Sequence, residues 1–306
     1  VTQPAAQQDR EFSLALGGAT LAVIAWGSSG VLIRHIEMGG LAIAVYRFWI
    51  YALVLLLWMR IHGDRLSLRI MRHSMYGGLA LGIDVALFFS AVKLTTIVNA
   101  TVISAPHPVI VGLIAWRFFG ERIRLRDAVL GLVALVAVVV VITAGTERPE
   151  WSLGGDLLAV GALLAWAAYF VFSKASREVL TPAEFTVGTA IWTASINLVL
   201  ALIIGQDLSP PSGSDWGWLL LLAFGAGVVG HSVMNWSLVR IPLWLGSTFT
   251  LLIPVTAATL AWVFLDQPLS ALQVGAMLVV VGALALLVIG QQTQATQPVP
   301  AEHETS

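Results

Sequence analysis

The sequence contains no cysteine and few charged residues. Of its 306 residues only 11% are Asp, Glu, Lys or Arg, whereas an average soluble domain carries roughly 25%. The absence of cysteine excludes disulfides, thiolate zinc sites, iron–sulfur clusters and cysteine nucleophiles. The shortage of charge argues against a soluble globular protein, because too few charges remain to cover its surface. The basic residues are dispersed, so there is no basic stripe of the kind that binds nucleic acid.

Long apolar runs make up most of the chain, of which 58% is hydrophobic. A membrane-spanning helix needs about 20 apolar residues. Runs such as LVALVAVVVVI lack the alternation of a β-barrel strand, so each run is expected to be a helix. The sequence therefore predicts an all-α integral membrane protein with ten transmembrane helices. The expected spans are 13–33, 39–59, 74–92, 96–116, 127–145, 154–173, 184–204, 216–238, 244–265 and 270–290.

The loops between these spans differ in charge. With the N-terminus inside, twelve Lys and Arg residues fall in cytoplasmic segments and three fall outside. Positive charge favours the cytoplasmic side, so both termini are expected there. Residues 1–12 are predicted to be a cytoplasmic tail, with no cleavable signal peptide. Residues 291–306 are polar, contain two prolines and are predicted to be a disordered cytoplasmic tail.

The two halves of the chain, 13–145 and 154–290, are related. Trp26 and Arg34 fall on Trp166 and Lys174 at an offset of 140 residues. At an offset of 146, Pro108, Ala115, Trp116 and Phe118 fall on Pro254, Ala261, Trp262 and Phe264. Five spans per half is an odd number, so the second half is predicted to be inverted in the membrane. Inverted repeats are typical of secondary transporters, whose substrate binds near the midplane. Chance similarity between apolar helices is the alternative.

Ionisable side chains inside spans are costly and are therefore functional candidates. Four qualify, namely Arg47, Asp84, His107 and His231. Asp84 and His231 are expected at comparable depths in opposite halves, where they would line a central cavity and exchange a proton. The alternative is that each of these two side chains forms its own hydrogen bonds with neighbouring hydroxyl groups or water. Arg47 fits a structural anchor at least as well as a substrate contact.

Aromatic and polar residues supply the other candidates. Mid-span aromatic residues that suit an apolar or aromatic substrate are Trp26, Phe88, Trp166 and Tyr169. Side chains that would exchange hydrogen bonds with the substrate are Asn99, Ser104, Asn235 and Thr250. Pro108 and Pro254 remove backbone hydrogen bonds from the fourth and ninth spans, so a kink and a gating role are expected. Packing of small residues between helices is the alternative for these two spans.

Several functional classes are disfavoured. The sequence has no GxxxxGK[ST] phosphate loop, no HExxH and no GxSxG motif. One mid-span carboxylate and two histidines are few for a membrane enzyme, and no channel filter is readable. We expect no enzymatic activity, no metal and no cofactor.

Together these features resemble the EamA-domain transporters of the drug/metabolite transporter superfamily. The residues that carry the resemblance include Trp26 followed by GSSG, Arg47, and the closing segments AWRFFGERIRLRD at 115–127 and AWVFLDQPLSALQ at 261–273. Within that superfamily the chain is most similar to the YddG-type aromatic amino-acid exporters of bacterial inner membranes. One departure is that Gly120-Glu121 becomes Asp266-Gln267, which argues against an essential acid at that position.

The resemblance implies a ten-helix exporter of small metabolites, such as amino acids including aromatic ones, that works by alternating access in a bacterial inner membrane. The expected partners are a small-molecule substrate and the bilayer, with no nucleic acid; a monomer is sufficient. Export of drug-like or lipid-like amphipathic compounds stays open as an alternative. The source of energy, whether proton exchange or a downhill gradient, also stays open.

Overall fold

The described part of the chain is helical. The structure is a computed structural model that describes residues 5–145 and 151–295, and within them it contains helices and no strand. Among these residues, ten helical segments are long and apolar enough to cross a membrane. The predicted all-α membrane fold is therefore confirmed. The helices are α1 (Ala5–Gly27), α2 (Ser29–Ile33), α3 (Gly40–Ile61), α4 (Leu68–Leu94), α5 (Ile97–Ser104), α6 (His107–Phe119), α7 (Leu125–Thr143), α8 (Leu153–Ala175), η1 (Ser176–Glu178), α9 (Pro182–Ile203), α10 (Gly213–Leu222), η2 (Ala223–His231), α11 (Ser232–Ser237), α12 (Leu243–Phe249), α13 (Leu252–Leu265) and α14 (Ala271–Ala295).

Some spans are built from more than one helical segment. The fourth span breaks between α5 and α6, and the ninth breaks between α12 and α13. Pro108 and Pro254 lie just after these breaks, and neither has an N–H to bond the carbonyl four residues earlier. At the second break the backbone hydrogen bonds join residues three positions apart instead of four, as in Ile253 N donating to Thr250 O at 2.9 Å. The expected distortion of both spans is present in the structure.

The eighth span contains a π-helix, η2, which the sequence did not predict. It lies between α10 and α11 and includes Gly225, Gly227 and Gly230. π-Helical turns are rare and frequently occur at functional sites. In this chain η2 ends at His231, one of the predicted site residues.

The helix boundaries differ from the expected spans where polar caps extend a helix. α4 begins at Leu68, six residues before the expected start at 74, because the Ser67 side chain accepts a hydrogen bond from Ile70 N and caps the first turn. At the other terminus α14 continues to Ala295, so the first residues of the expected C-terminal tail are helical. The rest of that tail, 296–306, lies outside the described residues.

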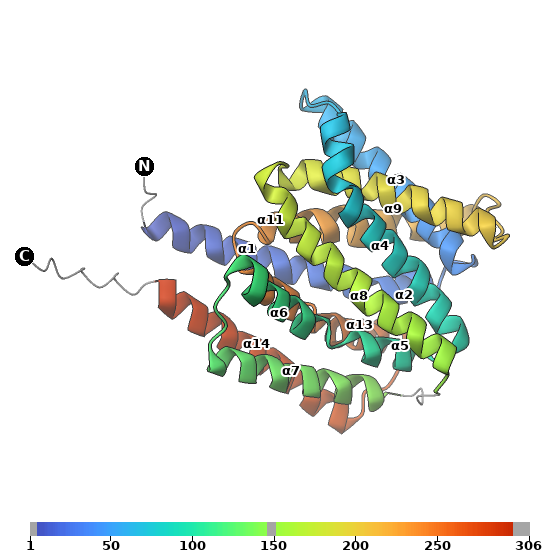
Figure 1. Cartoon of the computed structure of the whole chain (residues 1–306). Helices are drawn as coiled ribbons and strands as arrows, with labels where there is room; N and C mark the ends of the chain where they lie inside the picture. The colour runs from blue at the N-terminus through green and yellow to red at the C-terminus, as the bar shows by residue number, and fades with distance from the viewer. Residues whose placement is uncertain (1–4, 146–150, 296–306) are drawn as a thin grey trace, which may run out of the picture.

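The helices form one bundle in which segments of the two halves are interleaved. α4 packs along α8 and α9, and α3 packs along α9. α1 lies against η2, α11 and α13, so the first span is surrounded by helices from later in the chain. α7 and α14 pair at one edge of the bundle, and both termini lie on the same side of the molecule (Figure 1).

The bundle has two ends, each formed by alternate loops. Because the ten spans alternate in direction, both termini and the loop at 120–124 share one end, which we call the terminal end. The loops at 34–39 and 266–270 share the opposite end, which we call the far end.

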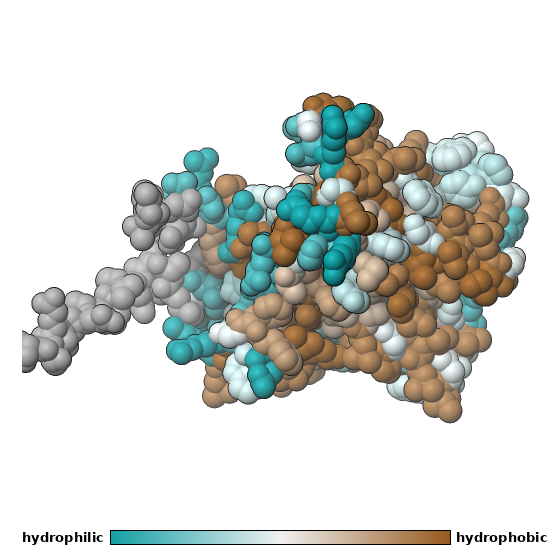
Figure 2. All heavy atoms as spheres, turned by 45° about the horizontal axis from the view of Figure 1, so that its top comes forward, coloured by the Kyte–Doolittle hydropathy of each residue, from teal (hydrophilic) through white to brown (hydrophobic). Residues whose placement is uncertain are grey.

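The outer surface of the bundle is largely apolar, as Figure 2 shows for one face. Large side chains in the middle of spans are widely exposed, including Leu53 at 59%, Leu132 at 57% and Leu278 at 68%. A soluble protein rarely exposes such extensive apolar surface, whereas lipid tails accept it. Between α7 and α14 this surface has an apolar groove lined by residues such as Val136, Ala137 and Val279.

Candidate functional site

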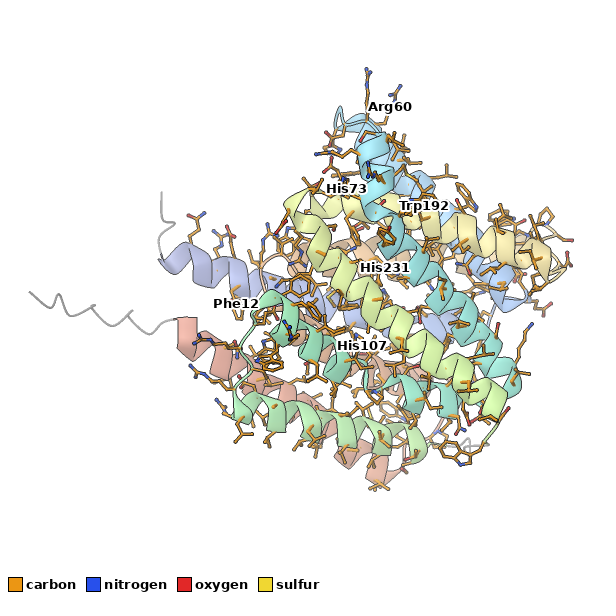
Figure 3. All side chains as sticks on the ribbon, viewed as in Figure 1. Phe12, Arg60, His73, His107, Trp192 and His231 are labelled. Atoms are coloured by element: carbon orange, nitrogen blue, oxygen red, sulfur yellow. The ribbon has the colours of Figure 1, made fainter. Side chains whose placement is uncertain are left out.

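A cluster of aromatic rings lies at the centre of the bundle, around His231. The ring is 3% exposed and is provided by the last residue of η2. In Figure 3, His231 and His107 lie inside the bundle, away from Arg60 and His73 at its upper end. Five aromatic rings have their centroids 5.2 to 6.4 Å from that of His231; they belong to Trp26, Phe48, Tyr51, Trp166 and Tyr169. We call these six residues the central cluster.

Both halves of the chain contribute to the central cluster. Trp26 from α1 and Trp166 from α8, which align in the sequence, meet edge to face with ring centroids 5.3 Å apart. Trp26 Nε1 also donates to the carbonyl of Ala226 in η2 at 3.1 Å. Gly230 makes this approach feasible, because a Cβ there would lie 2.5 Å from Trp26 Nε1. The first span is thus fixed to the π-helical part of the eighth span.

A buried chain of hydrogen bonds positions His231. Tyr169 Oη lies 3.2 Å from His231 Nδ1, and Asn235 Nδ2 donates to Tyr169 Oη at 3.0 Å. Since the tyrosine oxygen accepts from Asn235, its own proton is free to be donated to His231 Nδ1, which favours the tautomer protonated at Nε2. Asn235 is itself held by Thr186 and Ser173, with Ser173 Oγ donating to Asn235 Oδ1 at 2.8 Å. Ser173 and Thr186 were not predicted, since neither stands out in a polar or aromatic pattern.

His107 joins the two proline-containing spans. Its Nδ1 lies 3.2 Å from Thr250 Oγ1, and Thr250 Oγ1 donates to the carbonyl of Ser247 at 2.6 Å. The threonine oxygen therefore accepts from His107 Nδ1–H, which leaves Nε2 as an acceptor. That nitrogen is buried and has no hydrogen-bond partner among the described residues. The ring packs against Phe170 at 5.2 Å and Trp166 at 6.1 Å, so His107 borders the central cluster.

Other predicted site residues lie elsewhere. Asn99 donates to Asp156 Oδ1 at 3.4 Å, near the beginning of α8 at the far end of the bundle, and not into the centre. Phe88 packs on a small separate cluster that includes Ala100 and Ala159. Ser104 is half-buried at the end of α5. Helical spacing shows which face these residues occupy but not which neighbour that face meets.

Asp84 is not paired with His231. It is half-buried on α4, and in the described part of the chain its carboxylate makes no hydrogen bond or ion pair. The expectation that the two groups exchange a proton directly is thus not supported by a contact in this conformation.

Glu121 makes a contact that the sequence comparison undervalued. Its carboxylate accepts hydrogen bonds from Leu243 N at 2.8 Å and Trp244 N at 3.1 Å, and it forms an ion pair with Lys174. These are the first N–H groups of α12, which lack intrahelical partners, and Pro242 before them provides no side-chain cap. Glu121 therefore ties the loop after α6 to the ends of α8 and α12. We call this set of interactions the Glu121 contact.

The ninth span is buried unequally along its length. All seven residues of α12, on the terminal side of the break, are buried, whereas Val255 is the one buried residue in α13 on the far side. The fourth span differs, because residues 101–106 around its break are partly exposed and buried residues lie on both sides of them. α12 is thus enclosed by the bundle, whereas α13 lies at its apolar outer surface, where Trp262 and Phe264 are exposed.

The whole chain was compared with known proteins. The model of the EamA-like transporter family matches it twice, over residues 13–143 and 153–289. The chain belongs to the EamA-like transporter family. The resemblance seen in the sequence is thereby confirmed, and the chain is a multi-pass membrane protein of the drug/metabolite transporter superfamily.

Relatives of this EamA-family protein include named exporters. The uncharacterized transporter YyaM of Bacillus subtilis is 31% identical over 212 residues, 65% of this chain and 67% of the relative. A "probable amino-acid metabolite efflux pump" of Salmonella typhimurium is 25% identical over 188 residues, 58% of this chain and 62% of the relative. The aromatic amino acid exporter YddG of Ancylobacter novellus is 29% identical over 155 residues, 49% of this chain and 52% of the relative. The match thus spans less than two thirds of the last two proteins.

A solved crystal structure has the same fold. It superimposes with a TM-score of 0.77 over 90% of this chain and 97% of the other, at 21% sequence identity. At that identity the likeness shows the fold alone.

Proposed function

We propose that this EamA-family protein is a secondary transporter that exports small amphipathic metabolites, most notably amino acids including aromatic ones, across a bacterial inner membrane. The central cluster is the observation that carries this proposal. Aromatic rings with two imidazoles at mid-bundle suit an aromatic or apolar side chain, and the hydroxyl and amide groups behind them suit polar substrate groups. The names of two relatives, an amino-acid metabolite efflux pump and an aromatic amino acid exporter, support the same substrate class. The protein moves its substrate without chemical change, so it is a carrier and not an enzyme.

The proposed mechanism is alternating access. In this mechanism the Glu121 contact and the buried α12 form the closure of the terminal end. Opening of the terminal end requires the Glu121 contact to break and the segments on either side of the proline breaks to move. The short segments around Pro108 and Pro254 suit such movement, because the helical hydrogen bonding is already interrupted there.

The two halves form inverted repeats in this proposal, and both termini are cytoplasmic. One sequence comparison and one feature of local structure support the repeat. The family model matches each half separately, and Gly120 and Asp266, which align at the offset of 146, both adopt left-handed conformations that end α6 and α13, at φ 65° and 52°. The excess of Lys and Arg in the loops of the terminal end supports the orientation. Export then proceeds from the terminal end to the far end.

Energy coupling through Asp84 and His231 remains part of the proposal in an indirect form. Asp84 is a mid-span carboxylate without an ion-pair partner among the described residues, so its protonation can respond to substrate or to pH. Single Asp84→Asn and His231→Gln variants test this point in reconstituted protein. If both variants transport at the parent rate at every pH, the proton role is wrong.

The function is tested by counterflow. Proteoliposomes preloaded with unlabelled substrate are given a panel of labelled amino acids, with and without a pH gradient, beside empty liposomes. Uptake above the empty control establishes a carrier, and the panel identifies its substrates. Folded protein that shows no counterflow for any amino acid contradicts the amino-acid proposal and favours drug-like or lipid-like compounds.

A further inference from the structure

Three buried polar atoms at or next to the central cluster have no hydrogen-bond partners in the described part of the chain. They are Nε of Arg47, the hydroxyl of Tyr51 and the hydroxyl of Ser232. Tyr51 follows Arg47 by one turn on α3, so the two share a helix face. Ser232 begins α11 and directly follows His231, the ring on which Tyr51 stacks. We call these three residues the Arg47 group.

Arg47 is an unusual residue for the middle of a membrane protein. A guanidinium within a span is costly unless an anion or hydrogen-bond acceptors compensate its charge. Among the described residues, no carboxylate lies within 4.0 Å of it and no acceptor receives its hydrogen bonds. Within the described part of the chain the guanidinium makes a cation–π contact with Phe48, whose ring centroid lies 5.0 Å from the guanidinium carbon. The side chain is half-buried, so it is not sealed off within the bundle.

The guanidinium points toward the site and not toward the membrane surface. Phe48 and Tyr51 both lie deeper in the span than Arg47, as counted from the start of α3 at the far end. Arg47 is also near enough to interact electrostatically with Tyr51 and with His231. Both Phe48 and Tyr51 belong to the central cluster, and Tyr51 stacks on His231 with ring centroids 5.9 Å apart. A side chain that extended to the interface to reach water would lie away from these rings.

The chemistry of the Arg47 group matches a carboxylate. Guanidinium donors form a planar fork that bonds both oxygens of a carboxylate, and hydroxyl groups add further donors. A molecule that places an aromatic or apolar group among the rings of the central cluster would carry its carboxylate only a short distance away. The positive charge of Arg47 disfavours an ammonium group at the same place.

We propose that the Arg47 group is the subsite that binds the carboxylate of the transported molecule and so selects carboxylic acids over the corresponding amines. This inference rests on the proposed function, since it assigns a part of the same site. It adds that the substrates are anionic or zwitterionic. Arg47 is then a specificity-determining residue that touches substrate.

Thermal unfolding of the purified full-length protein in detergent tests the subsite without transport. The probes are phenylacetate and phenethylamine, which share a phenyl ring and differ in the charged group. The proteins are the parent, Arg47→Gln, Arg47→Lys and the control Arg60→Gln, whose arginine is exposed at the other end of α3. Bound ligand raises the unfolding midpoint in proportion to its affinity.

We expect phenylacetate to stabilise the parent and the control at the same concentration. Loss of a charged hydrogen-bond pair weakens binding roughly 10-fold to 100-fold, so Arg47→Gln should require that much more phenylacetate for the same shift. Arg47→Lys keeps the charge but loses the paired guanidinium donors, so its affinity for phenylacetate should lie between those of the parent and Arg47→Gln. If Arg47→Gln does not fold, the comparison of Arg47→Lys with the parent tests the subsite. Phenethylamine should not lose affinity in Arg47→Gln, because that substitution removes a positive charge that repels its ammonium group.

Equal phenylacetate stabilisation of the parent and both Arg47 variants overturns the subsite, as does a parent that phenylacetate does not stabilise. Counterflow separates this failure from failure of the function. If phenylalanine is transported and Arg47→Gln keeps the parent affinity for it, the subsite is wrong and the exporter stands. If phenylacetate binds through Arg47 but no amino acid is transported, the subsite stands and the amino-acid proposal falls.

Discussion

In the proposed mechanism the Glu121 contact holds the terminal end of the bundle closed, and its contribution to the free energy of closure follows from its hydrogen bonds and ion pair. The Glu121 carboxylate accepts two N–H bonds from the first turn of α12 and pairs with Lys174, and its side chain is 11% exposed. A hydrogen bond to a charged group contributes about 1.5–3 kcal/mol. Glu121→Gln keeps one acceptor oxygen but loses the charge. With Lys174 partly solvated, we expect the closed state to lose about 2 kcal/mol, which is about a 30-fold change in the ratio of closed to open molecules.

Site-specific labelling measures this change directly. Because the chain lacks cysteine, Ser247→Cys introduces a single thiol, and Ser247 is 0% exposed within the closed α12. In proteoliposomes the thiol should react with a maleimide only when the terminal end opens, so Glu121→Gln should label roughly 30-fold faster than the parent. Glu178→Gln is the matched control, because its carboxylate is exposed at the same end. Equal labelling rates in Glu121→Gln and the parent, in protein of equal stability, would refute the proposed closure.

Three further substitutions test the site. Tyr169→Phe removes the hydroxyl between the buried histidine and asparagine and should lower the free energy of unfolding by about 1–3 kcal/mol, whereas the exposed Tyr76→Phe should leave the unfolding midpoint unchanged. Gly230→Ala places a Cβ 2.5 Å from Trp26 Nε1, so it should displace the indole ring and slow counterflow. Gly17→Ala is the control and should transport at the parent rate, because a Cβ there has no atom within 4 Å. Equal counterflow rates in the two variants would contradict the role of the close approach at Gly230. Asp84→Asn should flatten the pH dependence of counterflow, and an unchanged pH profile would remove this carboxylate from coupling.

Hydropathy predicted the fold well because the bilayer imposes a simple rule. Each span has to satisfy its own backbone hydrogen bonds, so length and apolar content suffice to locate a helix. All ten expected spans correspond to helical segments in the described chain. The π-helix η2 escaped prediction, because its glycine-rich sequence is equally compatible with an α-helix that packs closely on a neighbour.

The sequence predicted some of the residues that meet in the central cluster, whose role in binding stays a prediction. Four predicted residues meet in the structure, namely Trp26, Trp166, Tyr169 and His231. They could be predicted because all four lie in the middle of spans and the two tryptophans align between the halves. Asn99 shows the limit of this reasoning. It is polar and near a span, but it lies on the first turn of α5 and bonds outside the centre, which depends on a helix boundary that hydropathy locates only within a few residues.

Glu121 shows a different limit of prediction from sequence. The sequence comparison disfavoured an essential acid at Glu121 because the second half has Gln267 in its place. The structure shows that the two positions face different demands. Pro242 leaves the first turn of α12 uncapped, so Glu121 supplies the acceptors from another part of the chain. Single-residue comparison between halves misses such exchanges, since the compensating change lies elsewhere in the sequence.

That difference in capping distinguishes the two ends of the bundle. Thr96, which aligns with Pro242 at the offset of 146, caps α5 with its own side chain by accepting from Asn99 N at 3.2 Å. The far end therefore caps its helix locally and does not need an acid at the position of Gln267. Gln267→Glu should restore a carboxylate there and favour closure of the far end, though by less than Glu121→Gln disfavours closure of the terminal end, because the local cap already satisfies one N–H group.

The same single thiol at Ser247 reports this change. Closure of the far end must be accompanied by opening of the terminal end if access alternates, so Gln267→Glu should raise the labelling rate from the terminal side by a few-fold, and combination with Glu121→Gln should raise it further. The increments should multiply, because the two substitutions act on opposite ends of one two-state equilibrium. A labelling rate that Gln267→Glu leaves unchanged, while Glu121→Gln raises it, would mean that the ends open independently and that alternation is not enforced by these contacts.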